Sequence, residues 1–243
     1  SGTASNVTYT TGKFGKGAAF NGSNSQISTS SFASLSQVSI SMWVNMPDIS
    51  QQAGLIARYG TNREFAIYMY SGTLTASIYY NGNNGNATQV TASTYMSNDT
   101  WHHIAYTANG STAPKLYIDN VEVGSPQYTD STRCAYYTSS EPLDIGHFAG
   151  ISAYNYEGKI DQVRLFDKEL SVGEINSLYN ETATSAALGT IDNPSLLAYY
   201  KMADATDETG NYDGTPTSVD FNVEGKYGFA GKFTGSSKIV IPS

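Results

Sequence analysis

The dominant pattern in the chain is an alternation of apolar and polar residues, which is the period of a β-strand with one buried face. The clearest case is residues 38–46, where Val38, Ile40, Met42 and Val44 alternate with serines, a tryptophan and an asparagine. Further runs of this kind predict strands at residues 65–70, 74–80, 101–107, 115–118, 121–123, 143–145, 159–166 and 196–202. Many short strands separated by turn residues favour an antiparallel sandwich or barrel.

Two local signals interrupt this alternation. Asp119-Asn120 separates two predicted strands, and both residue types tolerate the positive φ of a tight hairpin turn. Residues 170–179 predict a short helix, because Ser171 and Glu174 have the spacing of a capping box. The apolar residues that share one face of this helix are Ile175, Leu178 and Tyr179. We expect that face to pack on the sandwich.

The end of the chain repeats its beginning. The sequence Gly-Lys-Phe-Gly at residues 12–15, with Phe20 eight residues after its first glycine, returns as Gly-Lys-Tyr-Gly at residues 225–228, with Phe233 at the same interval. Before the second copy, residues 183–194 are rich in Thr, Ala, Ser and Asn without periodicity, which predicts a linker. The chain is therefore expected to divide into a domain at residues 1–182, the linker, and a repeat-start segment at residues 195–243.

Several motifs occur in an order that is typical of one family. They are residues 12–22, 38–44, 101–107, 116–120 and 158–171. Together they resemble the laminin-G-like domains of the concanavalin A-like jelly-roll superfamily. The resemblance implies an all-β fold, an antiparallel two-sheet jelly-roll sandwich, here with one short helix near residues 171–179. It also implies binding rather than catalysis, and commonly a calcium ion at the rim of the sandwich.

The chain departs from the family order at its ends. Residues 197–202 and 207–214 resemble the family's opening strand and turn, but they follow the domain that they should begin. Without that strand, neighbouring strands would keep unpaired edge groups. Three explanations stay open: the segment folds back in cis, it completes a neighbouring subunit by strand donation in a head-to-tail chain, or it begins a second domain.

Composition excludes some functions. Lys plus Arg is 13 and Asp plus Glu is 21, so the net charge of −8 argues against a nucleic-acid partner. No apolar run reaches the roughly 18 residues of a membrane helix, and Ser1 to Thr11 lacks the basic and apolar parts of a signal peptide, so we expect no membrane insertion. The single cysteine, Cys134, cannot form an internal disulfide.

Catalytic patterns are absent from the sequence. A retaining glycosidase needs two carboxylates about 5 Å apart, and the chain has no Glu-x-Asp-x-x-Glu triplet on a predicted strand. Glu157 and Asp161 are too far apart on an extended strand to replace it. His102 and His103 are adjacent on a strand and point to opposite faces, so they cannot chelate one ion, and His103 is expected to be a hydrogen-bonded sandwich residue. We therefore predict that the protein is not an enzyme.

Two kinds of binding site remain. Calcium prefers carboxylate, amide and carbonyl oxygens, and Asp204, Asp207 and Asp213 supply carboxylates in one Asp- and Gly-rich turn. The alternative for that turn is a solvated loop held by side-chain hydrogen bonds. Sugars favour aromatic platforms beside amides and hydroxyls. The candidate ligand-binding residues of this kind are Tyr79, Tyr80, Asn81, Asn83, Tyr154 and Tyr156.

These observations predict a non-catalytic module that acts outside the cell, on a cell surface or on a virion surface. Its expected roles are adhesion, recognition of a glycan or cell-surface polysaccharide, or self-assembly, with head-to-tail strand donation as the route to polymers. The alternative is a calcium-dependent, lectin-like carbohydrate-binding domain of a larger secreted enzyme or adhesin.

Overall fold

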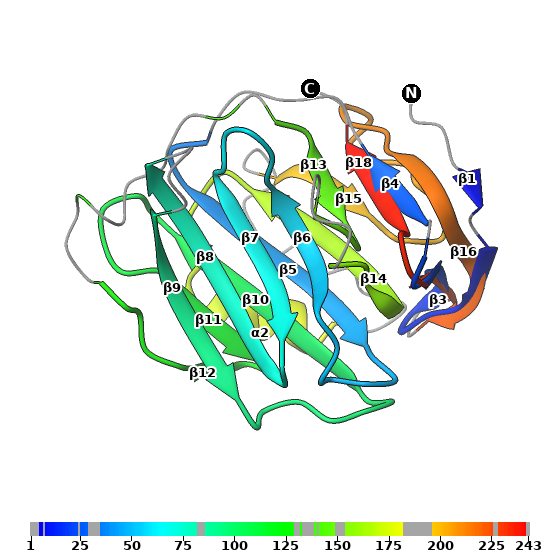
Figure 1. The fold of residues 1–243 in the computed structure, drawn as a ribbon, viewed down its shortest axis with the longest axis horizontal. Helices are drawn as coiled ribbons and strands as arrows, with labels where there is room; N and C mark the ends of the chain where they lie inside the picture. The colour runs from blue at the N-terminus through cyan, green and yellow to red at the C-terminus, as the bar shows by residue number, and fades with distance from the viewer. Residues whose placement is uncertain are drawn as a thin grey trace.

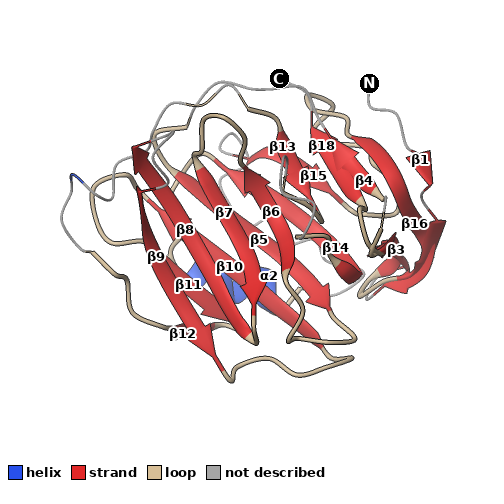
Figure 2. Ribbon diagram, viewed as in Figure 1, coloured by secondary structure: helices blue, strands red, loops and turns tan. Residues whose placement is uncertain are grey.

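The computed structural model of the chain consists almost entirely of β-strands. It describes residues 5–6, 8–23, 25–28, 35–81, 86–128, 132, 139, 141–148, 154–181, 196–225 and 228–241. The strands form two layers that pack face to face, with a single helix in the described part of the chain (Figures 1 and 2). The predicted linker at residues 183–194 and Cys134 lie outside the described residues.

The first layer is an antiparallel sheet in the order β12-β11-β10-β5-β14. These strands are Val121–Val123, Lys115–Ile118, Trp101–Ala108, Val38–Asn45 and Glu157–Phe166. The outer edge of β14 pairs with β15 (Leu196–Tyr200) at Val163–Phe166, so the predicted strand at residues 196–202 is present and lies beside β14. The sequence predicted every strand of this layer to within two residues at each end.

The second layer contains β6-β7-β8-β9, which covers the first layer in Figure 1. These strands are Ala53–Arg58, Phe65–Tyr70, Thr73–Asn81 and Asn86–Ser93. The layer continues past β6 through β13 (Leu143–Ile145), because the Gly146 N–H donates to the Leu55 oxygen at 2.8 Å. The alternation did not predict β6 and β9.

The hydrophobic core fills the space between the two layers. Inward side chains from both layers form one buried cluster. Fully buried examples are Ile40 and Ile104 from the first layer and Phe65, Ile67 and Ile78 from the second. Burying side chains of this size stabilises the folded state by roughly 1.5–3 kcal/mol each. The apolar positions of the alternating pattern are therefore the residues that pack between the two layers.

The helix α2 (Val172–Tyr179) packs on the outer face of the first layer (Figure 2). The predicted capping box is confirmed: the Glu174 N–H donates to Ser171 Oγ at 3.3 Å, and the Ser171 N–H donates to the Glu174 carboxylate at 2.8 Å. Ile175 and Leu178 are buried in a second apolar cluster. The other members of that cluster are Ala105, Tyr117, Phe166, Leu170, Leu196 and Tyr199.

The predicted hairpin between β11 and β12 is also confirmed. Asp119 and Asn120 have φ values of 49° and 67°, and a type I′ hairpin turn requires a positive φ at both of its central residues. Asp119 also fixes the neighbouring strand, since its carboxylate accepts the His103 N–H at 2.8 Å and lies 2.6 Å from His102 Nδ1. His102 and His103 point to opposite faces, and His103 Nε2 lies 2.8 Å from Ser41 Oγ inside the fold.

Both copies of the sequence repeat lie at one end of the sandwich, away from β9 and β12 (Figure 1). The N-terminal copy forms β2, β3 and β4, and the C-terminal copy forms β16, β17 and β18, while β1 (Ser5–Asn6) pairs with β16. The strands of the N-terminal copy are Thr8–Thr11, Gly15–Asn21 and Gln26–Ser28. Those of the C-terminal copy are Thr215–Gly225, Gly228–Phe233 and Lys238–Ile241.

Candidate functional site

The outer face of β7, β8 and β9 is polar and uncharged, and it carries tyrosines. On β7 the inward residues are apolar, while Tyr68 and Tyr70 point outward and are partly or largely exposed. The strand register places Tyr68 opposite Thr75 and Tyr70 opposite Thr73. The next register step places Gln89 of β9 opposite Ser77 of β8. The pairing of three strands thus gathers phenol, hydroxyl and amide groups on one surface.

A row of stacked aromatic rings supports this surface from the side of β6. Phe148 stacks between Tyr59 and Tyr154, with ring centroids 5.1 and 5.2 Å apart and planes within 15° of parallel. Tyr68 meets Phe148 and Tyr154 edge to face, at 5.4 and 5.9 Å. Arg63 covers the Tyr59 ring with its guanidinium 4.4 Å from the centroid. Such packing holds Tyr154 and Tyr68 in fixed orientations.

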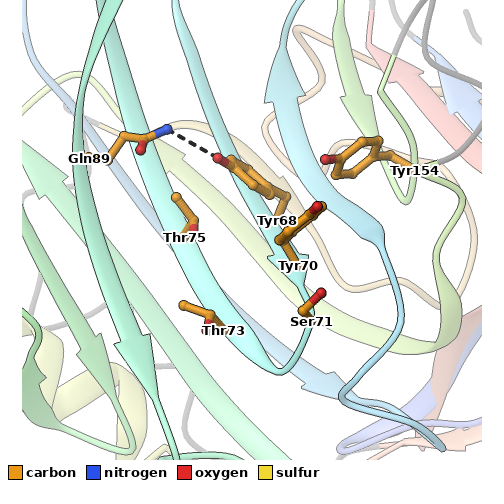
Figure 3. A pocket seen from close by; sticks show the side chains of 7 residues that line it. All are labelled: Tyr68, Tyr70, Ser71, Thr73, Thr75, Gln89 and Tyr154. Carbon is orange, nitrogen blue, oxygen red and sulfur yellow. Dashed lines mark hydrogen bonds between the residues drawn. The ribbon is translucent and has the colours of Figure 1, made fainter.

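A shallow hollow of about 560 Å³ lies between these tyrosines (Figure 3). Its lining residues are Tyr68, Tyr70, Ser71, Thr73, Thr75, Gln89 and Tyr154. Figure 3 shows Tyr154 on one side of the hollow and Gln89 on the other, with Tyr68 between them. The Gln89 amide donates to the Tyr68 hydroxyl at 3.1 Å and also lies 3.3 Å from Ser77 Oγ, which orients the amide. Among the described residues that line the hollow, none is Asp, Glu, Lys, Arg or His.

A second hollow of about 210 Å³ adjoins the first and shares Gln89 with it. Its lining residues are Tyr80, Asn86, Ala87, Gln89, Gln127 and Tyr128. The two hollows follow β8 and β9 across the outer face. Together they present aromatic rings at one end and several amides at the other.

The structure separates the predicted ligand-binding residues. Tyr154 and Tyr80 line the first and second hollow, respectively. Tyr79 is only 6% exposed and packs edge to face on Tyr59, so it supports the surface from below. Asn81 ends β8, and Asn83 lies outside the described residues.

The structure corrects the expectation for Tyr156. Its side chain is completely buried, and its hydroxyl lies 3.1 and 3.0 Å from the backbone oxygens of Asn45 and Lys159. Tyr156 therefore belongs to the core and does not reach the binding surface. Tyr156 directly precedes β14, and the first residue of that strand, Glu157, is exposed. Because neighbouring residues of an extended chain point to opposite sides, the Tyr156 side chain points inward.

The Tyr154 phenol of the first hollow remains protonated at neutral pH. Burial raises the pKa of the Tyr154 phenol, and the neighbouring Tyr68, Tyr70 and Tyr59 raise it further. Burial also raises the pKa of Tyr79 and Tyr59. Neutral phenols both donate and accept hydrogen bonds. The surface therefore offers donors and acceptors without net charge.

The Asp-rich turn is held together by hydrogen bonds. Asp207 is 1% exposed, and both of its carboxylate oxygens accept hydrogen bonds. The donors are the backbone N–H groups of Tyr199, Thr209, Asn211 and Tyr212 and the hydroxyl of Thr209. Asp213 accepts the Asp207 N–H at 3.0 Å, and Asp204 accepts the Thr206 N–H at 2.8 Å. This arrangement fastens the turn to β15.

These contacts do not favour a calcium ion, because Asp207 is buried and both of its oxygens already accept hydrogen bonds. Among the residues that the structure describes, no three His, Cys, Asp or Glu side chains gather as metal ligands would. No helix of the described chain is long and apolar enough to cross a membrane. His147, in a loop, lies 2.9 Å from Asn155 Oδ1, and burial together with the charge of Lys238 lowers its pKa to about 4.

Sequence reasoning missed Tyr68, Tyr70 and Gln89. The signal was present for the tyrosines, because the predicted strand at residues 65–70 places Phe65, Ile67 and Met69 inward and leaves the tyrosines on the polar face. Gln89 lies on β9, a strand that the alternation did not predict. Its place opposite Ser77 depends on pairing between strands and has no local signature.

The fold is a jelly-roll sandwich whose outer sheet carries a hollow lined by tyrosines, hydroxyls and an amide. A family described as the concanavalin A-like lectin/glucanases superfamily matches residues 20–176, which is more than half of the chain. The protein therefore belongs to the laminin-G-like branch of this superfamily, as the sequence motifs indicated.

Three solved structures illustrate the same fold. A native heptameric SAP-like pentraxin from Limulus polyphemus has a TM-score of 0.54 and 10% identity, over 70% of this chain and 83% of its own. A putative carbohydrate-binding protein from Bacteroides ovatus has a TM-score of 0.59 and 14% identity, over 85% and 59%. The binding domain of Paraclostridial Mosquitocidal Protein 1 has a TM-score of 0.58 and 16% identity, over 75% and 47%. No curated protein sequence matches the chain.

Proposed function

We propose that the protein is a non-catalytic carbohydrate-binding domain whose site is the outer face of β7, β8 and β9. The observation that carries this proposal is the uncharged hollow between Tyr68, Tyr70 and Tyr154, with Gln89 and several hydroxyls around it. A sugar ring has apolar C–H faces and a polar rim, so it matches an aromatic platform bordered by amides and hydroxyls. The likeness in fold to a putative carbohydrate-binding protein supports the same function.

The absence of charge on the hollow narrows the ligand class. A lining without carboxylates or cations offers no partner for a uronic acid, a sulfate or a phosphate. We therefore propose a neutral glycan, such as a segment of a cell-surface polysaccharide. The adjoining hollow at Tyr80 and Asn86 would hold further sugar units, because Gln89 is common to both.

The proposal extends to the location of the protein. A glycan-binding domain meets polysaccharides outside the cell or on a cell or virion surface, where it would serve adhesion. Calcium at Asp204, Asp207 and Asp213 stays a separate prediction. Its support is the family resemblance, while the hydrogen bonds of Asp207 argue against it. Labelling of intact cells or particles with an antibody to the domain would test the location.

The function is tested with a glycan microarray followed by calorimetric titration of the best ligand. Tyr70→Ala and Tyr154→Ala should weaken binding at least about tenfold, because each removes part of the aromatic platform. Tyr95→Ala is the matched control, since Tyr95 is 50% exposed, close to the 48% of Tyr70, but lies outside both hollows. Its affinity should equal that of the unaltered chain.

Two results would contradict the proposal: failure of the unaltered chain to bind any glycan, or equal affinities for Tyr70→Ala and Tyr95→Ala. Repeating the titration with calcium and with a chelator separates the calcium prediction, since unchanged affinity under chelation would exclude a calcium-dependent site.

A further inference from the structure

The two copies of the sequence repeat occupy the same place beside β14 and β13. Gly158 of β14 pairs with Phe20 of the N-terminal copy and with Phe233 of the C-terminal copy. In the second layer, Ile145 of β13 pairs with Ile27 of the one copy and Ile239 of the other. We call these two edges, residues 157–160 of β14 and 144–145 of β13, the acceptor site. Each copy crosses from one layer to the other and closes the end of the sandwich.

The overlap extends to side chains. The rings of Phe20 and Phe233 are parallel within 5° and fall on the same position in the core. A Cβ atom built on Gly231 would fall on Ala18 of the other copy, and one built on Gly235 would fall on Ser23. Since protein interiors are filled to the density of crystals, one volume holds one ring. The two copies cannot occupy the acceptor site together.

Each copy is a complete unit for this position. The turn after its central strand begins with a glycine in the left-handed region, Gly22 at φ 65° and Gly235 at φ 69°. The same hydrogen bond closes both turns: the Asn21 N–H donates to Ser25 Oγ at 3.0 Å, and the Thr234 N–H donates to Ser237 Oγ at 2.8 Å. Both copies therefore bring the same local structure to the site.

The copies differ in how much of β14 they cover. The C-terminal segment carries β15, which pairs with β14 at Val163–Phe166 on the edge that continues the acceptor site. The described residues of the N-terminal copy pair with β14 only at Glu157–Ile160, and they add one contact, from the Phe14 N–H to the Asp161 carboxylate at 2.7 Å. The described residues of the N-terminal copy therefore leave Val163–Phe166 of β14 to a strand from another segment. Open strand edges of this kind accept an additional strand.

We propose that the two copies are alternative occupants of the acceptor site, and that the site exchanges its occupant with a second copy of this chain. Among the described residues, the C-terminal segment covers the longer edge of β14, so it displaces the N-terminal copy of the chain that receives it. The donating segment and the acceptor site are different surfaces, so the contact is heterologous and can extend into open chains. This interaction uses the edges of β13 and β14, whereas the proposed glycan site lies on the outer face of β7, β8 and β9.

Disulfide trapping in the full chain tests the exchange. Lys159 of β14 pairs with Ala19 of one copy and with Lys232 of the other. Paired strands bring Cα atoms to about 4.5–5.5 Å, which suits a disulfide. With Cys134 replaced by serine, the variants Lys159→Cys/Ala19→Cys and Lys159→Cys/Lys232→Cys should each form an intrachain disulfide. The two yields report the share of each occupant.

A mixture of two chains tests the second partner. One chain carries Lys159→Cys, and the other, with a tag of different size, carries Lys232→Cys. We expect a disulfide-linked heterodimer whose yield rises with protein concentration, while intrachain yields do not. A chain with the exposed Lys115→Cys is the control for random collision. Light scattering of the unaltered chain should show the mass rising above one chain over the same range.

The outcomes separate the two parts of the proposal. If only one of the intrachain pairs forms a disulfide, the copies are not alternative occupants. If both form but the heterodimer does not exceed the Lys115→Cys control, exchange between chains is wrong. Neither result bears on glycan binding, which the Tyr70→Ala series measures by itself.

Discussion

Phe65 and Phe20 are equally buried, but one segment of the chain reaches the position of Phe65 and two segments reach that of Phe20. Phe65, on β7, fills a position in the sandwich body that a single segment of the chain can reach. Phe20 lies at the end of the sandwich, in a position that Phe233 reaches as well. Burial alone therefore does not measure how much a residue contributes to stability. The contribution also depends on whether another segment can take the same place.

The largest expected difference is between substitutions of these phenylalanines. Phe65→Ala should lower the free energy of unfolding by about 3–5 kcal/mol, because it leaves a cavity that nothing else in the sandwich body fills. Phe20→Ala and Phe233→Ala should each cost less than about 1 kcal/mol, since the other copy supplies the ring. Urea unfolding measures all three values.

The double variant Phe20→Ala/Phe233→Ala removes the ring from both copies of the repeat. It should cost about as much as Phe65→Ala, so the two single effects are far from additive. A single Phe20→Ala that costs as much as Phe65→Ala would show that the N-terminal copy alone closes the sandwich.

A smaller effect is expected at the helix, which has no second copy. Ser171→Ala should lower the free energy of unfolding by about 1 kcal/mol, because it removes the side-chain oxygen that accepts the Glu174 N–H. Ser177→Ala is the control, since Ser177 lies in the same helix and its hydroxyl only donates to the Gly173 oxygen. Equal losses for both serines in urea unfolding would refute a capping contribution.

The smallest effect concerns acid stability of the β11–β12 hairpin. Burial acts to raise the pKa of Asp119, but hydrogen bonds from His102 and from the His103 N–H outweigh it and hold the pKa below its ordinary value of 3.8. The unfolded chain then binds a proton before the folded chain, so stability falls as the pH drops through 3.8 and below.

Asp119→Asn should flatten this loss, because asparagine keeps the turn conformation but does not titrate. The measurement is the urea midpoint at neutral pH and near pH 3. Asp167→Asn, an exposed carboxylate, is the control and should keep the pH dependence of the unaltered chain. A steep loss in both variants would assign acid sensitivity to other groups.

Local patterns in the sequence predicted the strands of the first layer and, in the second layer, β7, β8 and β13, but not the strands of the two repeat copies. The alternation at residues 38–46, the capping box at Ser171 and the Asp119-Asn120 turn each act within a few residues, and each is confirmed. β6 was missed for a physical reason: all of its residues are buried on both faces, so it has no alternation. The internal repeat could be recognised in the sequence. The sequence did not predict that both copies pair with the same residues of β14.

The candidate site was less predictable, because it depends on pairing between strands. Tyr154 and Tyr80 were found as aromatic residues near polar loops, while Tyr70 and Gln89 meet only through the register of β7, β8 and β9. Tyr156 was expected at the surface and is in the core, since a single residue decides which face a side chain takes.

The uncharged lining of the first hollow also determines how binding responds to ionic strength. Salt screens interactions between charges, with a Debye length of about 8 Å in physiological salt. The residues around Tyr68 and Gln89 contribute dipoles and ring faces instead of charges, although the chain as a whole carries a net charge of −8. The affinity of the hollow for a neutral ligand would therefore be the same in fresh water, in tissue fluid and in seawater.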